Sequence, residues 1–112
     1  MTQHDIRFRL QHMLDNAKEA LSLIENKKLD DLKNQRMLEL SLIRLVEVVG
    51  EAAARISYEE QEKYSNIPWA QVVGMRNRLA HGYDQVDLDI LWNTIELDLP
   101  LLIKELEKIL ES

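Results

Sequence analysis

Four side chains that lie close together in the sequence have types suited to chemistry: Arg76, Asn77, His81 and Tyr83, in the segment VVGMRNRLAHGYDQVD (72–87). On a helix each residue turns by about 100°, which places Arg76 on the apolar face and places Asn77 and His81, four apart, together on the adjacent face. An arginine in an apolar stripe must pair with an acid or open onto a cleft that an anion enters. The spacing therefore predicts a salt bridge or an anion-binding site.

Whether Arg76 forms a salt bridge or part of an anion-binding site, its expected acidic partners lie on a preceding helix. Glu47 and Glu51 are four apart, so they share one helix face, and we expect one of them to pair with Arg76. In the structural interpretation, Arg76 has no role beyond this ion pair. His81 then stabilises the negative C-terminal end of its helix, and Tyr83 is a packing residue. In the functional interpretation the ion pair holds Arg76 ready for a ligand.

The elements that position these residues are predicted to be helices. Aromatic content is 5%, with three glycines and two prolines, which argues against a turn-rich β protein. Apolar residues recur every three or four positions, which is typical of helices packed on one face. The predicted helical segments are 5–26, 31–57, a short polar turn within 57–66, 68–81, and 87 to the end. We expect one all-α domain over 1–112, an up-and-down bundle of about four to five helices.

Particular residues are expected to set the helix ends. Asp30 or Asp31 is a candidate cap for the second helix, and an aspartate at 87 or 89 for the last one. Pro68 suits the first position of a helix, Gly82 suits a stop, and Pro100 suggests a kink or a restart with Asp98 as cap. Gly50 is either a site of close backbone approach or a tolerated surface glycine.

Composition and charge exclude several classes of protein. The chain has no cysteine, so it has neither disulfides nor a thiolate metal site, and no apolar run approaches the roughly 18 residues that a membrane span needs. With no signal-peptide core at the start, the cytoplasm is the expected location. No metal-ligand set or cofactor motif is visible, and His4 and His12 are interpreted as surface residues. The net charge of −6 means that any contact with RNA must use a local basic cluster.

The segment RNRLAHGY resembles the signature of the HepT-like toxins of the HEPN superfamily, in which an arginine and a polar residue precede a histidine and a tyrosine. The resemblance extends over IPWAQVVGMRNRLAHGYDQVDLDILWNTIELDLPLL and includes VVGEAAARIS, so it covers nearly the whole chain. It implies the HEPN fold, a homodimer whose motif helices face each other across a cleft, and a metal-independent endoribonuclease that is the toxin of a toxin–antitoxin pair.

The resemblance also implies roles for the motif residues. Arg76 and His81 are the expected catalytic pair, with Arg76 binding the phosphate and His81, whose ordinary pKa is about 6.5, acting as base or acid. Asn77 and Tyr83 are expected to orient the histidine or bind the substrate. The implied partner is a minimal nucleotidyltransferase antitoxin that adds AMP to Tyr83.

Two other functions are considered beside the ribonuclease. One is a non-catalytic HEPN module that only docks a nucleotidyltransferase, which the acidic net charge favours. The other is a plain structural dimer, which leaves Arg76 unexplained.

Overall fold

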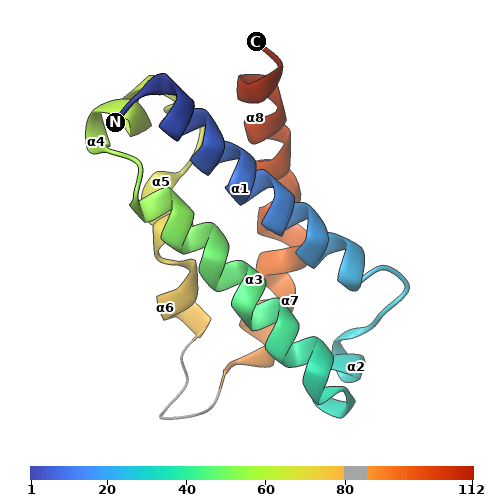
Figure 1. The fold of residues 1–112 in the computed structure, drawn as a ribbon. Helices are drawn as coiled ribbons and strands as arrows, with labels where there is room; N and C mark the ends of the chain where they lie inside the picture. Colours follow the sequence, from blue (N-terminus) through green and yellow to red (C-terminus); the bar gives the residue numbers. More distant parts are fainter. Residues whose placement is uncertain (80–85) are drawn as a thin grey trace.

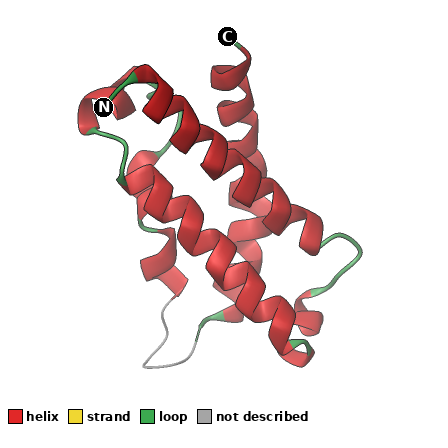
Figure 2. Ribbon diagram, in the orientation of Figure 1, coloured by secondary structure: helices red, strands yellow, loops and turns green. Residues whose placement is uncertain are grey.

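The structure, a computed structural model, describes residues 1–79 and 86–112. In these ranges every regular element is helical, so the all-α prediction is confirmed (Figures 1 and 2). The elements are α1 (Gln3–Leu23), α2 (Leu29–Asn34), α3 (Arg36–Ala54), α4 (Tyr58–Lys63), α5 (Trp69–Val73), α6 (Met75–Leu79), α7 (Leu88–Asn93), the π-helical segment η1 (Thr94–Asp98) and α8 (Leu99–Glu111).

The long helices α1 and α3 run antiparallel and pack along each other, and the α7–η1–α8 segment crosses behind them (Figure 1). The short helices α5 and α6 pack against the side of α3. No helix within residues 1–79 and 86–112 is both long enough and apolar enough to cross a membrane.

Helix α1 follows the sequence prediction closely. All six residues of its predicted stripe are buried: Ile6, Leu10, Met13, Ala17, Ala20 and Ile24. Thr2 caps the helix, because its hydroxyl accepts a hydrogen bond from the Asp5 N–H at 3.1 Å while the Asp5 carboxylate accepts one from the Thr2 N–H at 3.2 Å. These hydrogen bonds lower the pKa of Asp5.

The predicted helix 31–57 is two helices, α2 and α3, which are separated at Gln35. Neither predicted aspartate is the N-terminal cap of α2, because Asp31 lies inside the helix and accepts a hydrogen bond from the Lys28 N–H at 2.7 Å. The apolar spacing predicts a stripe on this helix that excludes Val46 and consists of Leu38, Leu42, Leu45, Val49, Ala52 and Ile56. Val46 is instead fully buried, and Leu38 and Leu45 are half-buried, in a helix that packs against both α1 and α5.

Gly50 is a site of close approach between α3 and α5. A Cβ atom at this position would lie 3.2 Å from the Val72 carbonyl oxygen and 3.4 Å from that of Val73. A methyl group at this position would require the neighbouring backbone to shift by a few tenths of an ångström, so the close-approach interpretation of Gly50 is confirmed. This contact brings the segment after Pro68 against the middle of α3.

The predicted helix 68–81 is broken. Helix α5 begins at Trp69, with Pro68 just before it, and ends at Gly74, after which α6 begins at Met75. A Cβ at Gly74 would lie 3.1 Å from the Ala70 carbonyl oxygen, so this turn also suits a glycine. The predicted stop at Gly82 lies outside the described residues.

The C-terminal segment begins at the predicted cap, where the Asp87 carboxylate accepts a hydrogen bond from the Ile90 N–H at 3.1 Å. Asp98 occupies the predicted N-cap position of α8, but its side chain makes no capping hydrogen bond there. The chain passes through the π-helical turn η1 and enters α8 without a stop, with Pro100 in the first turn, where a missing N–H is tolerated.

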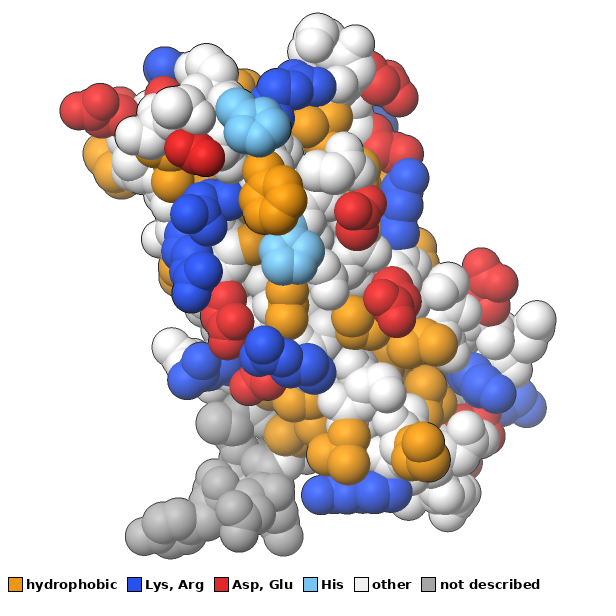
Figure 3. Space-filling view, viewed as in Figure 1, with side chains coloured by type: hydrophobic (Ala, Val, Ile, Leu, Met, Phe, Trp, Pro, Cys, Tyr) orange, Lys and Arg blue, Asp and Glu red, His pale blue; other side chains and the backbone are white. Residues whose placement is uncertain are grey.

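The face in Figure 3 carries both signs of charge. A band of Lys and Arg side chains, with acidic side chains among them, runs down one side of this face beside two histidines. The overall net charge of −6 therefore does not prevent a local concentration of basic groups on this face.

Candidate functional site

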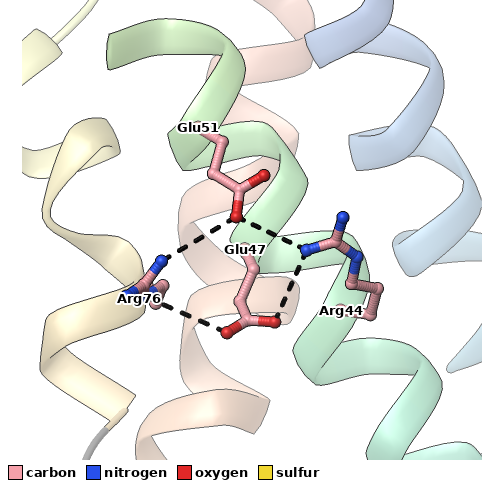
Figure 4. A network of polar contacts seen from close by, with 4 residues as sticks. All are labelled: Arg44, Glu47, Glu51 and Arg76. Carbon is pink, nitrogen blue, oxygen red and sulfur yellow. Dashed lines mark hydrogen bonds and ion pairs between the residues drawn. The ribbon is translucent and has the colours of Figure 1, made fainter.

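The candidate site is a network of four charged side chains on α3 and α6. Helix α3 presents Arg44, Glu47 and Glu51 at positions i, i+3 and i+7, which lie on one face. Helix α6 brings Arg76 to the opposite side of the two glutamates, as Figure 4 shows. The two carboxylates therefore lie between two guanidinium groups.

The distances show how the carboxylates are shared. Arg76 Nε lies 4.0 Å from Glu47 Oε2, and Arg76 Nη1 lies 3.8 Å from Glu51 Oε1. On the other side, Arg44 Nη1 donates a hydrogen bond to the same Glu51 oxygen at 3.4 Å and lies 3.9 Å from Glu47 Oε1. The ion pair expected from the sequence is present, and Arg76 contacts both glutamates rather than one.

Several contacts hold α6 in place beside α3. Met75 and Leu79 are buried in the core, and the close approach at Gly50 fixes the preceding α5. Arg78 donates a hydrogen bond from Nη2 to the Gln71 carbonyl oxygen at 3.3 Å, and its Nη1 lies 3.9 Å from Asp98 Oδ2 in η1. These contacts position Arg76 from both ends of the short helix.

The environment of Arg76 differs from the prediction. Its side chain is 59% exposed, so Arg76 does not lie in the middle of a buried apolar stripe. The reason is the break at Gly74, which ends the regular 100° progression and places Met75 at the buried position. Solvent-exposed ion pairs stabilise a fold by only about 0–1 kcal/mol, so this network is a weak argument for stability.

The guanidinium of Arg76 keeps donors for a ligand. Its distances to the two glutamates exceed the 2.7–2.9 Å of a strong charge-assisted hydrogen bond. Among the described residues, no side chain or carbonyl accepts a hydrogen bond from it. Arg76 is therefore oriented by two carboxylates, is open to solvent, and can present its planar fork of N–H groups to an anion.

Asn77 is exposed on α6 and lines a different surface from the one that carries the glutamates. It borders an open groove over α4, α5 and the end of α3, together with Ala54, Tyr58, Trp69, Val73 and Gly74. Tyr58 is 74% exposed and Val73 is 38% exposed, so the groove presents apolar surface to solvent. An apolar surface thus begins one residue away from Arg76.

The predicted positions of His81 and Tyr83 lie outside the described residues, so their roles stay predictions. Among the described residues, the Asp87 N–H donates a hydrogen bond to the Leu79 carbonyl oxygen at 3.0 Å. His4 and His12 are exposed on α1, and within the described ranges no group of three or more His, Asp and Glu side chains is arranged to hold a metal ion.

Sequence reasoning did not identify Arg44 as part of the site. The spacing could have indicated it, because Arg44 precedes Glu47 by three residues and Glu51 by seven, on the same face of one helix. What the spacing did not reveal is that Arg44 and Arg76 share the two carboxylates from opposite sides.

Comparisons with known proteins agree with this architecture. The sequence profile described as "Ribonuclease HepT-like" matches residues 13–109. A protein of Methanocaldococcus jannaschii, provisionally named an RNase, is 32% identical over 107 residues, which cover 96% of this chain and 98% of that protein. A protein of Thermococcus cleftensis, named "probable ribonuclease HepT", is 32% identical over 100 residues, which cover 86% of this chain and 91% of that protein. No solved structure matches this chain.

Proposed function

Since this chain belongs to the ribonuclease HepT-like family, we propose that it is an endoribonuclease, the toxin of a toxin–antitoxin pair. The observation that carries the proposal is Arg76: an exposed guanidinium, oriented by Glu47 and Glu51, with donors left for an anion. The printed names of the relatives point to the same activity. The proposed location is the cytoplasm.

The proposed reaction needs no metal ion. The ribose 2′-OH attacks the adjacent phosphorus while a histidine takes its proton, the bond from phosphorus to the 5′-oxygen breaks, and a protonated histidine gives a proton to that oxygen. The products are a 2′,3′-cyclic phosphate and a 5′-hydroxyl. His81 is the proposed base or acid. Arg76 donates hydrogen bonds to the phosphate oxygens and stabilises the negative charge that develops on them. Asn77 and Tyr83 orient the imidazole or contact the nucleotide.

A homodimer is part of the proposal. A two-fold axis would bring two copies of Arg76 and His81 to one cleft and so double the local positive charge. The apolar groove beside Asn77 supports an interface close to the site, because exposed side chains such as Tyr58 and Val73 gain from burial.

The proposed regulator is a minimal nucleotidyltransferase antitoxin that adds AMP to Tyr83. In the sequence Tyr83 follows Arg76 by seven residues and His81 by two. Each AMP group would add a negative phosphodiester and bulk next to the residues proposed to bind RNA phosphate, and this would oppose substrate binding.

The alternative function is a non-catalytic module that docks a nucleotidyltransferase. The net charge of −6 favours it, because the chain as a whole repels RNA. An exposed Arg76 that makes no close hydrogen bond to any described residue disfavours it, because a docking module has no need of such a group.

The test is RNA cleavage by the purified protein in EDTA, with wild type compared with His81→Ala. Intact mass must first show that the sample carries no AMP. Cleavage by wild type alone supports the ribonuclease. Equal cleavage by both proteins identifies a contaminating nuclease, and no cleavage by either favours the docking module.

A further inference from the structure

A second basic site lies on the face formed by α1 and α3. The α1–α3 pocket is lined by Phe8, Arg9 and His12 of α1 and by Glu51, Ala52 and Arg55 of α3, with Val48 beneath. Its volume is about 160 Å³. This is below the roughly 300–1,000 Å³ of pockets that enclose whole small molecules, and it suits a single charged group.

The arginines of this pocket are short of acceptors. Arg9 Nε is buried and has no hydrogen-bond partner among the described residues. In the same part of the chain, no carboxylate lies within 4.0 Å of Arg9 or Arg55, because Glu51 is paired with Arg44 and Arg76. Buried donors are normally satisfied, so an unpaired guanidinium N–H calls for an acceptor from outside the chain.

An aromatic platform borders the pocket. The side chain of Phe8 is 64% exposed, and its ring centroid lies 6.1 Å from that of His12 at a tilt of 41°. His4 precedes Phe8 by one helical turn, and Figure 3 shows two histidines with a hydrophobic side chain between them on this face. Cationic side chains next to exposed aromatic rings are the pattern of proteins that bind single-stranded nucleic acid.

The pocket and the candidate catalytic site share a wall. Glu51 lines the pocket, and its carboxylate lies 3.8 Å from Arg76. The described residues that line the pocket and form the network include four arginines, Arg9, Arg44, Arg55 and Arg76, and two glutamates, Glu47 and Glu51. These six side chains together carry positive charge in a chain whose net charge is −6.

We propose that the α1–α3 pocket binds a phosphate of the RNA next to the one that is cleaved, and that the neighbouring base stacks on Phe8. The ligand class is single-stranded RNA, whose phosphate oxygens are acceptors for Arg9 and Arg55. This inference rests on the proposed ribonuclease function and adds to it a direction for the strand, from Arg76 across α3 to α1.

The test measures binding of a fluorescein-labelled single-stranded oligonucleotide of 12 nucleotides, with 2′-deoxyribose throughout so that it is not cleaved, by fluorescence anisotropy. The variants are Arg9→Gln with Arg55→Gln, and Phe8→Ala. The matched control is Lys27→Gln with Lys33→Gln, which removes the same charge from exposed positions near or on α2. The second readout is cleavage of a ribodinucleotide, which is too short to reach the pocket.

Phe8→Ala is expected to weaken binding about tenfold, as for loss of one base stack. The double arginine variant is expected to weaken it by a similar factor at low salt and to reduce its salt dependence. The control and the cleavage of the dinucleotide are expected to stay at the wild-type level. Circular dichroism and sedimentation are measured alongside, because they report whether the fold and the oligomeric state are kept.

Other outcomes overturn the inference. Unchanged binding in both test variants, or equal weakening in the control, shows that the pocket holds no phosphate. A changed oligomeric state shows that this face contacts a second copy instead. If wild type cleaves RNA while the pocket variants bind normally, only this inference fails. If wild type cleaves no RNA while the pocket variants bind less tightly, the pocket binds single-stranded nucleic acid but not beside a cleaved phosphate, and the proposed catalysis fails.

Discussion

The carboxylate of Glu51 on α3 lies 3.8 Å from the guanidinium of Arg76 on α6. The same Glu51 oxygen accepts a hydrogen bond from Arg44 at 3.4 Å, so Arg76 competes with Arg44 for it. Glu51 is thus shared by the two arginines. Its contact with Arg76 is long, so it orients the guanidinium without forming a close hydrogen bond to it.

Removing the two carboxylates should impair catalysis more than folding. In Glu47→Gln with Glu51→Gln, Arg76 loses its orienting partners, while the site becomes more positive. We expect kcat for RNA cleavage to fall about tenfold, with KM unchanged or lower, and the free energy of unfolding to change by less than about 1 kcal/mol. Steady-state kinetics and urea denaturation measure the two effects.

The matched control for this prediction is Glu25→Gln with Glu111→Gln, which removes the same charge from exposed positions elsewhere. If the control lowers kcat equally, or if the Glu47 and Glu51 variant keeps the wild-type kcat, these glutamates do not position Arg76.

Arg44 should affect activity only through the shared glutamates. In Arg44→Gln the Glu51 carboxylate is released from its hydrogen bond and is free to pair more closely with Arg76, which then has fewer donors for the substrate. We expect lower cleavage activity in Arg44→Gln, and a partial recovery when Glu51→Gln is added.

A double-mutant cycle measures this coupling between Arg44 and Glu51. The effects of Arg44→Gln and Glu51→Gln on cleavage activity are expected to be non-additive in the double variant. Strict additivity of the two substitutions would contradict the proposed sharing.

Substitutions of Gly50 should lower the free energy of unfolding more as the new side chain becomes larger. Gly50→Ala gains about 1 kcal/mol of helix propensity but places a Cβ 3.2 Å from the Val72 carbonyl oxygen. Overpacking costs about 1–3 kcal/mol, so we expect Gly50→Ala to be close to neutral or about 1 kcal/mol destabilising. Gly50→Val should be destabilising by about 3 kcal/mol.

Urea denaturation measures both Gly50 variants, and Ser41→Val, at an exposed position of the same helix, is the control for the effect of a β-branched residue. Because Gly50 lets α5 approach α3, we also expect the Val variant to displace α6 and reduce RNA cleavage. A stable and fully active Gly50→Val protein would show that this approach is not needed.

Tyr83 is the proposed site of AMP addition, so Tyr83→Phe should not be modified by the cognate nucleotidyltransferase and ATP. Intact-mass measurement of each product gives the number of AMP groups. We expect Tyr83→Phe to cleave RNA in the presence of the antitoxin and ATP, under conditions that silence wild type. Tyr58→Phe and Tyr64→Phe are the controls, and AMP found on Tyr83→Phe would place the modification elsewhere.

The helical class, the apolar face of α1, an aspartate cap at 87 or 89 and the family could all be predicted from the sequence, although α1 runs from Gln3 to Leu23 and not over 5–26. These features depend on local causes: the period of the apolar residues, the hydrogen bond from a capping carboxylate, and a contiguous motif. The pairing of Arg76 with one of Glu47 and Glu51 is also predicted, although its premise, an arginine in a buried apolar stripe, is wrong because Arg76 is exposed.

The positions at which the predicted helices break, and the faces that they bury, depend on tertiary packing. The helix breaks at Gly74 where α5 packs closely against Gly50, and Arg76, just after the break, is exposed and not part of a buried apolar stripe. The sharing of Glu51 with Arg44, and an Arg9 Nε that has no partner among the described residues, depend on how α1, α3 and α6 come together. Contacts between residues far apart in the chain follow from packing of all helices at once, and no local pattern contains that information.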